Sequence, residues 1–315
     1  MGESRGLHRL AVATAGATFV LLFVGGLVTS TGSALAVPDW PLANGQFFPP
    51  MVGGVLFEHG HRLAASAVGC LTLALALWTV VGEPRAAVRV LGLLALFAVI
   101  LQGVLGGITV LYKLPLAVSV THACLAQTFF CLTVTLAIVT GRRWRDAEPV
   151  LSADEGTALT WLAALTTAVV FLQLVLGALM RHMGAGLAIP DFPLAFGRVV
   201  PPLATPFVAV HFAHRVGALV VATAVLLTAT RVLRRHAGVP SLRRGALLAL
   251  ALVVLQIGLG ATIIWTRRAV VPTTTHLVIG AALLATCLAL GLRAARATAP
   301  RRAPRRAVAL GQALA

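Results

Sequence analysis

The sequence has 315 residues, of which 59% are hydrophobic and only 11% are charged. Soluble proteins carry about a quarter charged residues, so the mean hydropathy of +0.95 indicates that lipid surrounds most of the chain. The formal net charge of +16 does not predict nucleic-acid binding. The arginines lie in short gaps between apolar segments, and no basic stripe with interleaved aromatic residues is present.

Eight apolar segments are long enough to cross a bilayer, which takes about 20 residues of helix. The first is predicted to be a span and not a cleavable signal, because no A-x-A-like site follows it. The sequence therefore predicts an all-α integral membrane protein with eight transmembrane helices. The segments lie near residues 10–31, 60–81, 88–111, 119–140, 158–180, 210–231, 245–265 and 273–294.

The distribution of arginines predicts the orientation, because loops rich in Lys and Arg stay in the cytoplasm. Arginines crowd both ends of the chain and alternate gaps, whereas the other gaps contain only Lys113, Arg181, Arg198, Arg267 and Arg268. Both termini are therefore predicted to be cytoplasmic, in a bacterial inner membrane. The long proline- and glycine-rich loops at 32–57 and 182–209 are predicted to cap the outer face.

The chain contains an internal repeat. GSALAVPDWPLANGQFFPP, from Gly32, matches GAGLAIPDFPLAFGRVVPP, from Gly184, at 11 of 19 positions. HRLAASAVG likewise matches HRVGALVVA, LQGVLGG matches LQIGLGA, and VTHACL matches TTHLVI. Each half has four spans and returns to its starting side. The halves are thus predicted to be tandem parallel four-helix bundles with pseudo-twofold symmetry about the membrane normal.

The repeat divides the chain into an N-terminal half at 1–145, a cytoplasmic linker at 146–157, a C-terminal half at 158–296 and an arginine-rich cytoplasmic tail at 297–315. All four cysteines lie inside apolar segments without a CxxC spacing, so they are predicted to pack and not to form disulfides or a zinc site. They are Cys70, Cys124, Cys131 and Cys287.

Four histidines stand at equivalent places in the two halves: His61, His122, His214 and His276. Each opens an even-numbered span, and all of these spans start on the outer side. Two imidazoles that face each other across a four-helix bundle can bind heme iron. An interfacial ring at a helix entrance is the alternative for any one of them, but the repetition favours ligands.

Glu58 lies three residues before His61, so the two side chains share a helix face. A carboxylate at the edge of a span is costly and usually functional; the alternative is a first-turn residue favoured by the helix dipole. The matching residue in the second half is His211. This break in the repeat predicts acid–base chemistry in the first half alone.

Other polar residues lie close to these positions. Arg62 and Arg215 directly follow two of the histidines and are predicted to pair with an anionic propionate, or else to reach toward lipid headgroups. The matched amides Gln102 and Gln256 are predicted to hydrogen-bond between helices. Three other histidines are predicted to lie at the surface: His59, His182 and His236.

Taken in order on eight spans, these motifs resemble the heme A synthase family over nearly the whole chain. The resemblance rests on PDWPL at Pro38, ExxHR at Glu58, TH at His122, HxxHR at His211 and TH at His276. One departure concerns cysteine. Many members carry a cysteine pair that flanks PDWPL, and here Val37 and Ala43 occupy those places, which rules out a thiol relay through this loop.

The resemblance implies an oxidoreductase that converts heme O to heme A by oxidising the C8 methyl group to a formyl group through successive hydroxylations. It implies heme b bound by His214 and His276, substrate heme O bound at His61 and His122, and Glu58 as the required glutamate. It also implies delivery of heme O by a heme O synthase and supply of heme A to heme-copper oxidases. The electron acceptor and any homo-oligomer are left open.

Two other functions fit parts of the pattern. A di-heme b-type electron carrier without substrate chemistry explains the four histidines but gives no reason for Glu58. A transporter of two parallel repeats would use the histidines as proton relays. Its binding residues are expected near the bilayer midplane, whereas the histidines here cluster toward the outer edge.

Overall fold

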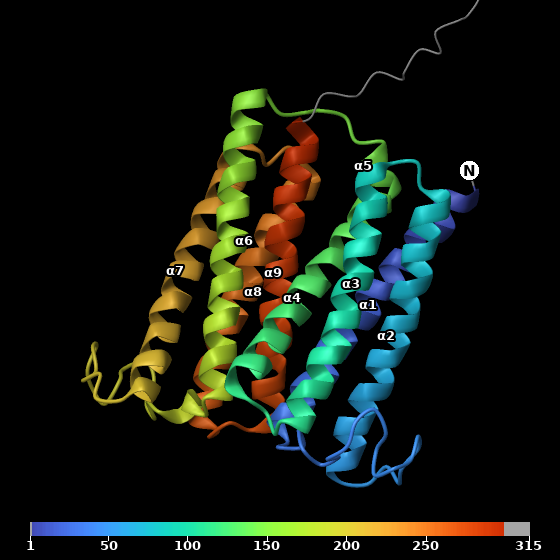
Figure 1. Ribbon diagram of the computed structural model, residues 1–315. Helices are drawn as coiled ribbons and strands as arrows, with labels where there is room; N and C mark the ends of the chain where they lie inside the picture. The colour runs from blue at the N-terminus through green and yellow to red at the C-terminus, as the bar shows by residue number, and fades with distance from the viewer. Residues whose placement is uncertain (1, 299–315) are drawn as a thin grey trace, which may run out of the picture.

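The computed structural model describes residues 2–298 and contains eight helices long and apolar enough to cross a membrane, which confirms the predicted spans (Figure 1). Two short elements join them, the helix α5 (Arg142–Arg145) and the 3₁₀ helix η1 (Ala185–Leu187). The long helices are α1 (Gly2–Ser30), α2 (Gly54–Gly82), α3 (Ala86–Leu111), α4 (Leu116–Thr140), α6 (Ala153–His182), α7 (Pro206–Arg235), α8 (Pro240–Trp265) and α9 (Val270–Thr298).

The helices extend beyond the apolar segments at several ends. α1 begins at Gly2 and not near residue 10, and α6 begins at Ala153, inside the predicted linker. Apolar side chains mark the part of a helix that lipid surrounds, whereas the helical backbone hydrogen bonds continue into the membrane–water interface. Ser152 caps α6 by accepting a bond from the N–H of Glu155 at 3.4 Å. From residue 299 on, the predicted arginine-rich tail lies outside the described residues.

The contacts between helices are consistent with two four-helix halves. α1 and α3 each contact both α2 and α4, and α6 and α8 each contact both α7 and α9. The halves meet where α1 and α4 contact α6 and α9, and the spans of α4 and α9 are the most buried of the eight. In Figure 1 both ends of the described chain lie at one end of the molecule, and the two long loops lie at the other.

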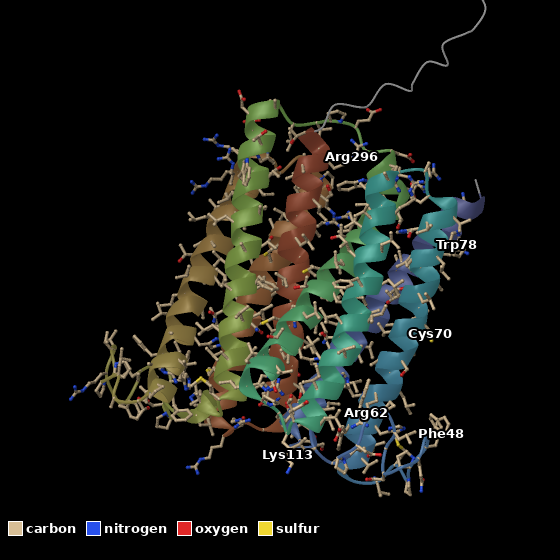
Figure 2. The ribbon with its side chains drawn as sticks, viewed as in Figure 1. Phe48, Arg62, Cys70, Trp78, Lys113 and Arg296 are labelled. Carbon is tan, nitrogen blue, oxygen red and sulfur yellow. The ribbon has the colours of Figure 1, made fainter. Side chains whose placement is uncertain are left out.

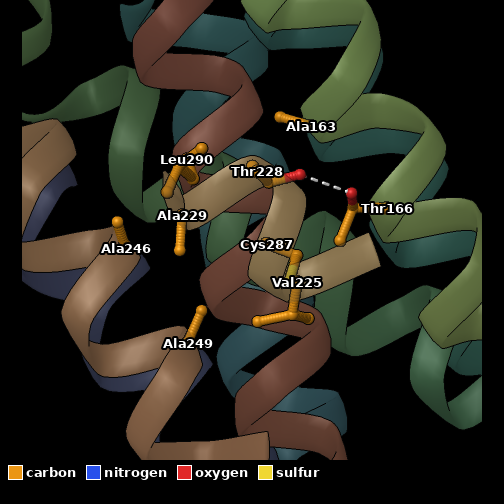
Figure 3. Close-up of a pocket in the computed structure, with 9 residues that line it drawn as sticks. All are labelled: Ala163, Thr166, Val225, Thr228, Ala229, Ala246, Ala249, Cys287 and Leu290. Atoms are coloured by element: carbon orange, nitrogen blue, oxygen red, sulfur yellow. Dashed lines mark hydrogen bonds between the residues drawn. The ribbon is translucent and has the colours of Figure 1, made fainter. Parts of the chain in front are cut away.

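The two halves differ in the core that lies away from these loops. Leu75 of α2 is fully buried in the N-terminal half, and the repeat places Thr228 of α7 at the same position. The Thr228 hydroxyl lies 2.7 Å from that of Thr166, beside a small cavity lined by nine residues, four of them alanines (Figure 3). Cys287, which also lines this cavity, is about 16 Å along α9 from His276 at 1.5 Å per residue. The cavity is therefore remote from the histidines.

A polar junction joins the halves at the loop end. Arg181, near the end of α6, donates to the carbonyl of Gly26 at 3.0 Å, to the hydroxyl of Ser30 at 3.1 Å, and to the hydroxyl of Thr29. Thr274 of α9 donates to the same Ser30 hydroxyl at 3.0 Å. A cation is favourable at the C-terminal end of α1, because the carbonyls there lack helical partners.

The two outer loops are built on the same hydrogen bonds. Asp39 accepts from the N–H of Asn44 at 2.7 Å and from that of Gly45 at 2.8 Å. The bond from Gly45 is the main cause that lowers the pKa of Asp39 below its ordinary value, and the charge of Arg62 adds to it. The second loop repeats the arrangement at Asp191, which accepts from Phe196 and Gly197 at 2.7 and 2.8 Å.

Replacing Arg181 with leucine is expected to lower the thermal unfolding midpoint in detergent. The change removes the charge-assisted bonds to the carbonyl of Gly26 and to the hydroxyls of Thr29 and Ser30, at a cost of about 1–3 kcal/mol. Arg198→Leu is the matched control, because Arg198 is exposed in the second loop. Equal midpoints for the two variants would show that the junction does not hold the halves together.

Asp39→Asn is expected to speed amide hydrogen exchange in the first loop at neutral pH, because the amide oxygen cannot replace both carboxylate bonds. In the unaltered protein the folded pKa is depressed. The stabilisation is therefore complete above the unfolded pKa and is lost only as pH falls through the lower, folded pKa. Mass spectrometry of loop peptides measures the exchange, with Asp146→Asn as the control. Unchanged loop exchange in Asp39→Asn would contradict this role.

Candidate functional site

The four repeat-matched histidines all lie in the loop-side part of their helices, within about three turns of the first residue. Each ring packs against a glycine of the preceding helix. A methyl group added to that glycine would lie 2.9 to 3.6 Å from the ring Cε1, and closest at Gly25 and Gly177. Each ring therefore occupies space that the missing side chain leaves. The pairs are His61 with Gly25, His122 with Gly106, His214 with Gly177 and His276 with Gly260.

In the C-terminal half the rings of His214 and His276 face each other across α7 and α9. Their centres are 6.5 Å apart and their planes are inclined by 64°. Two imidazoles that bind one metal ion from opposite sides have ring centres about 6 Å apart, because each nitrogen lies about 2 Å from the metal. The pair can therefore hold a metal ion between its rings.

Two imidazoles leave most coordination positions of a metal ion to other ligands. Within residues 2–298, no group of three or more His, Cys, Asp or Glu side chains could hold a metal ion. A porphyrin supplies the remaining ligands itself, and axial histidines are its common partners in proteins. The paired histidines therefore suit a metalloporphyrin better than a bare ion.

Unpaired buried nitrogens also mark these rings. The Nδ1 atoms of His61, His122 and His276 are buried and have no hydrogen-bond partner among the described residues. Buried polar atoms without partners are rare in proteins and often lie where a ligand, ion or water binds. His214 differs, because its Nδ1 lies 3.1 Å from Nε2 of Gln173.

Three glutamines donate across helices to the backbone of the histidines. The interhelical role predicted for Gln102 and Gln256 is confirmed, and Gln173 of α6 adds a third bond of this kind. Sequence analysis missed Gln173, although an amide inside an apolar segment, where the repeat has Leu21, was a usable signal. The bonds are Gln102 to the carbonyl of His122 at 3.0 Å, Gln256 to that of His276 at 2.9 Å and Gln173 to that of His214 at 2.8 Å.

Arg62 and Arg215 hold the two outer loops onto their helices. Figure 2 shows Arg62 and Lys113 at the loop end of the molecule. The guanidinium groups donate to matched backbone carbonyls in the two loops, so the prediction that they bind a propionate stays a prediction. Arg62 donates to Val37, Asp39 and Leu42 at 3.1, 2.8 and 2.9 Å, and Arg215 to Ile189, Asp191 and Leu194 at 3.2, 2.7 and 2.8 Å.

Glu58 is buried, with 4% of its surface exposed. Its carboxylate accepts from Arg62 at 2.7 Å and from the N–H of Val37 at 2.8 Å. His211, at the matching position, accepts from the N–H of Ile189 on Nδ1 at 3.2 Å. The two residues thus anchor their loops in the same way. What distinguishes the two anchors is the carboxylate itself.

The surface prediction for two other histidines is wrong. His59 is only 5% exposed and His236 only 4%, whereas His182 is partly buried. His59 follows Glu58 in the part of α2 over which the first loop folds, and His236 lies in a connection of residues 236–239 that is too short to leave the helices. In both cases the burial depends on which other segments pack against the histidine, and the local sequence pattern does not show this.

Comparisons with known proteins agree with this arrangement. The family model COX15-CtaA, described as cytochrome oxidase assembly protein, matches residues 52–288. A protein of Symbiobacterium thermophilum is 36% identical over 80% of this chain and 84% of its own length. Relatives from Lysinibacillus sphaericus (29%, 85% of this chain and 88% of the relative) and Geobacillus kaustophilus (28%, 84% and 83%) are also similar. All three are named heme A synthase. With its eight spans and paired histidines, the chain belongs to the COX15-CtaA family.

Proposed function

We propose that this protein is a heme A synthase, an oxidoreductase that oxidises the C8 methyl group of heme O to a formyl group. The observation that carries the proposal is an asymmetry between two otherwise matched sites. All four histidine rings pack in the same way, but only the N-terminal pair has a buried carboxylate, Glu58, on the helix that carries one of its rings. The names of the relatives support this reading.

The C-terminal half holds heme b between His214 and His276. The 6.5 Å between the ring centres suits two imidazoles that would bind one iron. When bound, the iron supplies the redox chemistry, as cofactors do in enzymes of this kind. The protein contributes the two rings, the helices that exclude water around them, and the second loop that Arg215 holds in place.

The N-terminal half holds heme O between His61 and His122, with Glu58 one helical turn before His61. Arg62 donates to Oε1 of Glu58, and the N–H of Val37 donates to Oε2. These bonds fix the position of a carboxylate, a group that can take up a proton in acid–base chemistry. Glu58 can therefore accept a proton released during oxidation of the substrate, while Arg62 keeps the loop closed over it and pairs with a propionate through its remaining donor.

The protein spans a bacterial inner membrane with both termini in the cytoplasm and the heme sites toward the outer face. This orientation is supported by the arginines, which crowd the end of the molecule that carries the termini, where Figure 2 shows Arg296. Heme O comes from a heme O synthase, and the product serves heme-copper oxidases.

A di-heme electron carrier is the second candidate, and the matched packing of the two histidine pairs favours it. Such a protein would retain two unmodified hemes and would not need the carboxylate. Chromatography of hemes extracted after co-expression with a heme O synthase separates the two functions, because only an enzyme yields the formyl heme.

Replacement of Glu58 by glutamine isolates the chemical role of the carboxylate. The amide oxygen can still accept from the N–H of Val37, so Glu58→Gln keeps this loop anchor and removes the ionisable group. Heme A formation is expected to fall by about 10²–10⁴-fold, the usual contribution of a general base, in both Glu58→Gln and Glu58→Ala. The absorption of heme b is expected to persist.

The matched control is His211→Glu, which keeps the second anchor and is expected to retain heme A formation. Quantification of extracted heme A against heme O provides the measurement. Normal heme A formation by Glu58→Gln would show that the glutamate acts only as a loop anchor.

A further inference from the structure

Three of the four ring-bearing histidines receive a glutamine hydrogen bond on their backbone carbonyl, and His61 is the exception. The preceding helix carries Gln173 in the C-terminal half and Leu21 at the matching place in the N-terminal half. Gln102 lies 3.3 Å from Nε2 of His122, and Gln173 lies closer to a ring nitrogen, 3.1 Å from Nδ1 of His214. The corresponding Nδ1 of His61 is buried and has no partner among the described residues.

The space that Gln173 needs is provided by a second substitution between the halves. Its Oε1 lies against Gly217, where an added side-chain carbon would overlap it. The repeat places Ala64 at the position of Gly217. The C-terminal half therefore has both the glutamine and the glycine that makes room for it. The N-terminal half has neither at the matching positions.

We propose that Gln173 is a positioning residue that fixes the ring of His214 as a permanent axial ligand, whereas Leu21 leaves the ring of His61 free to release its heme. The inference rests on the proposed function, since it assigns retention to the cofactor half and exchange to the substrate half. An enzyme whose substrate and cofactor are both hemes needs such a difference, because product must leave one site while the other stays occupied.

The physical basis is the hydrogen bond to the nitrogen that does not bind the metal. A ligating histidine presents that nitrogen as an N–H to an acceptor, which fixes the ring and raises its basicity as a ligand. A half-turn about the last side-chain torsion, which has a broad energy profile, brings Oε1 of Gln173 to Nδ1–H of His214. The carbonyl of His214 keeps its bond within α7, so the exchange leaves it satisfied.

The test exchanges these two residues between the halves in the full-length chain. Gln173→Leu with Gly217→Ala gives the C-terminal half the residues of the N-terminal half, and Leu21→Gln with Ala64→Gly does the reverse. The first pair is studied with His122→Ala and the second with His276→Ala, so that one site dominates each measurement. The readouts are the rate of heme transfer to apomyoglobin and the midpoint potential of the bound heme.

The first pair is expected to release heme about 10–100-fold faster, the usual effect of losing a partner of a metal-bound histidine, and to raise the midpoint potential. The second pair is expected to slow release from the N-terminal half. Gln256→Leu is the matched control. Gln256 donates to the carbonyl of His276 and, within residues 2–298, makes no hydrogen bond to a ring nitrogen. It is expected to leave the potential unchanged.

Equal potentials and release rates for the Gln173→Leu pair and the Gln256→Leu control would overturn the inference. If the Gln173→Leu, Gly217→Ala protein does not assemble, the Leu21→Gln, Ala64→Gly protein provides the test. An unchanged rate of heme release from its N-terminal half would equally overturn the inference. These failures differ from failure of the proposed function. In that case the unaltered protein would hold no heme bound by His214 and His276, or would form no heme A.

Discussion

The arrangement depends on imidazole rings that are held inside a lipid-surrounded helix bundle. Each ring fills the space beside a glycine of the preceding helix, so the two helices approach closely at each ring. Close approach at small residues is the main way in which helices pack in a membrane, where the hydrophobic effect between helices is absent. Because these contacts recur near the loop ends of α2, α4, α7 and α9, the two halves carry their histidine pairs at matched places.

Duplication supplied matched sites, and a few substitutions gave them different chemistry. The loops are fixed by the same aspartate and arginine bonds, and Glu58 and His211 anchor them at the same backbone N–H. A carboxylate at one anchor changes the charge next to a ring without disturbing the loop. Val37 and Ala43, at the places where the resemblance implies a cysteine pair, are fully buried within a loop held by hydrogen bonds.

Much of the fold could be predicted from the sequence, because the length and polarity of a span are local properties. The eight helices and the interhelical roles of Gln102 and Gln256 followed from such patterns. The burial of His59, the loop contacts of Arg62 and the ring contact of Gln173 did not, since each depends on which distant segment folds against that residue. A comparison of the halves position by position would have found Gln173, as it found Glu58.

The central claim is that His214 and His276 hold one heme iron between them. Electron paramagnetic resonance of the oxidised, full-length protein tests it most directly, because two axial imidazoles give low-spin iron. In protein in which His61 and His122 are replaced by alanine, the account predicts a low-spin signal that disappears when either His214 or His276 is also replaced, while replacement of the buried His236 leaves it intact. An identical low-spin signal after replacement of both His214 and His276 would contradict the account.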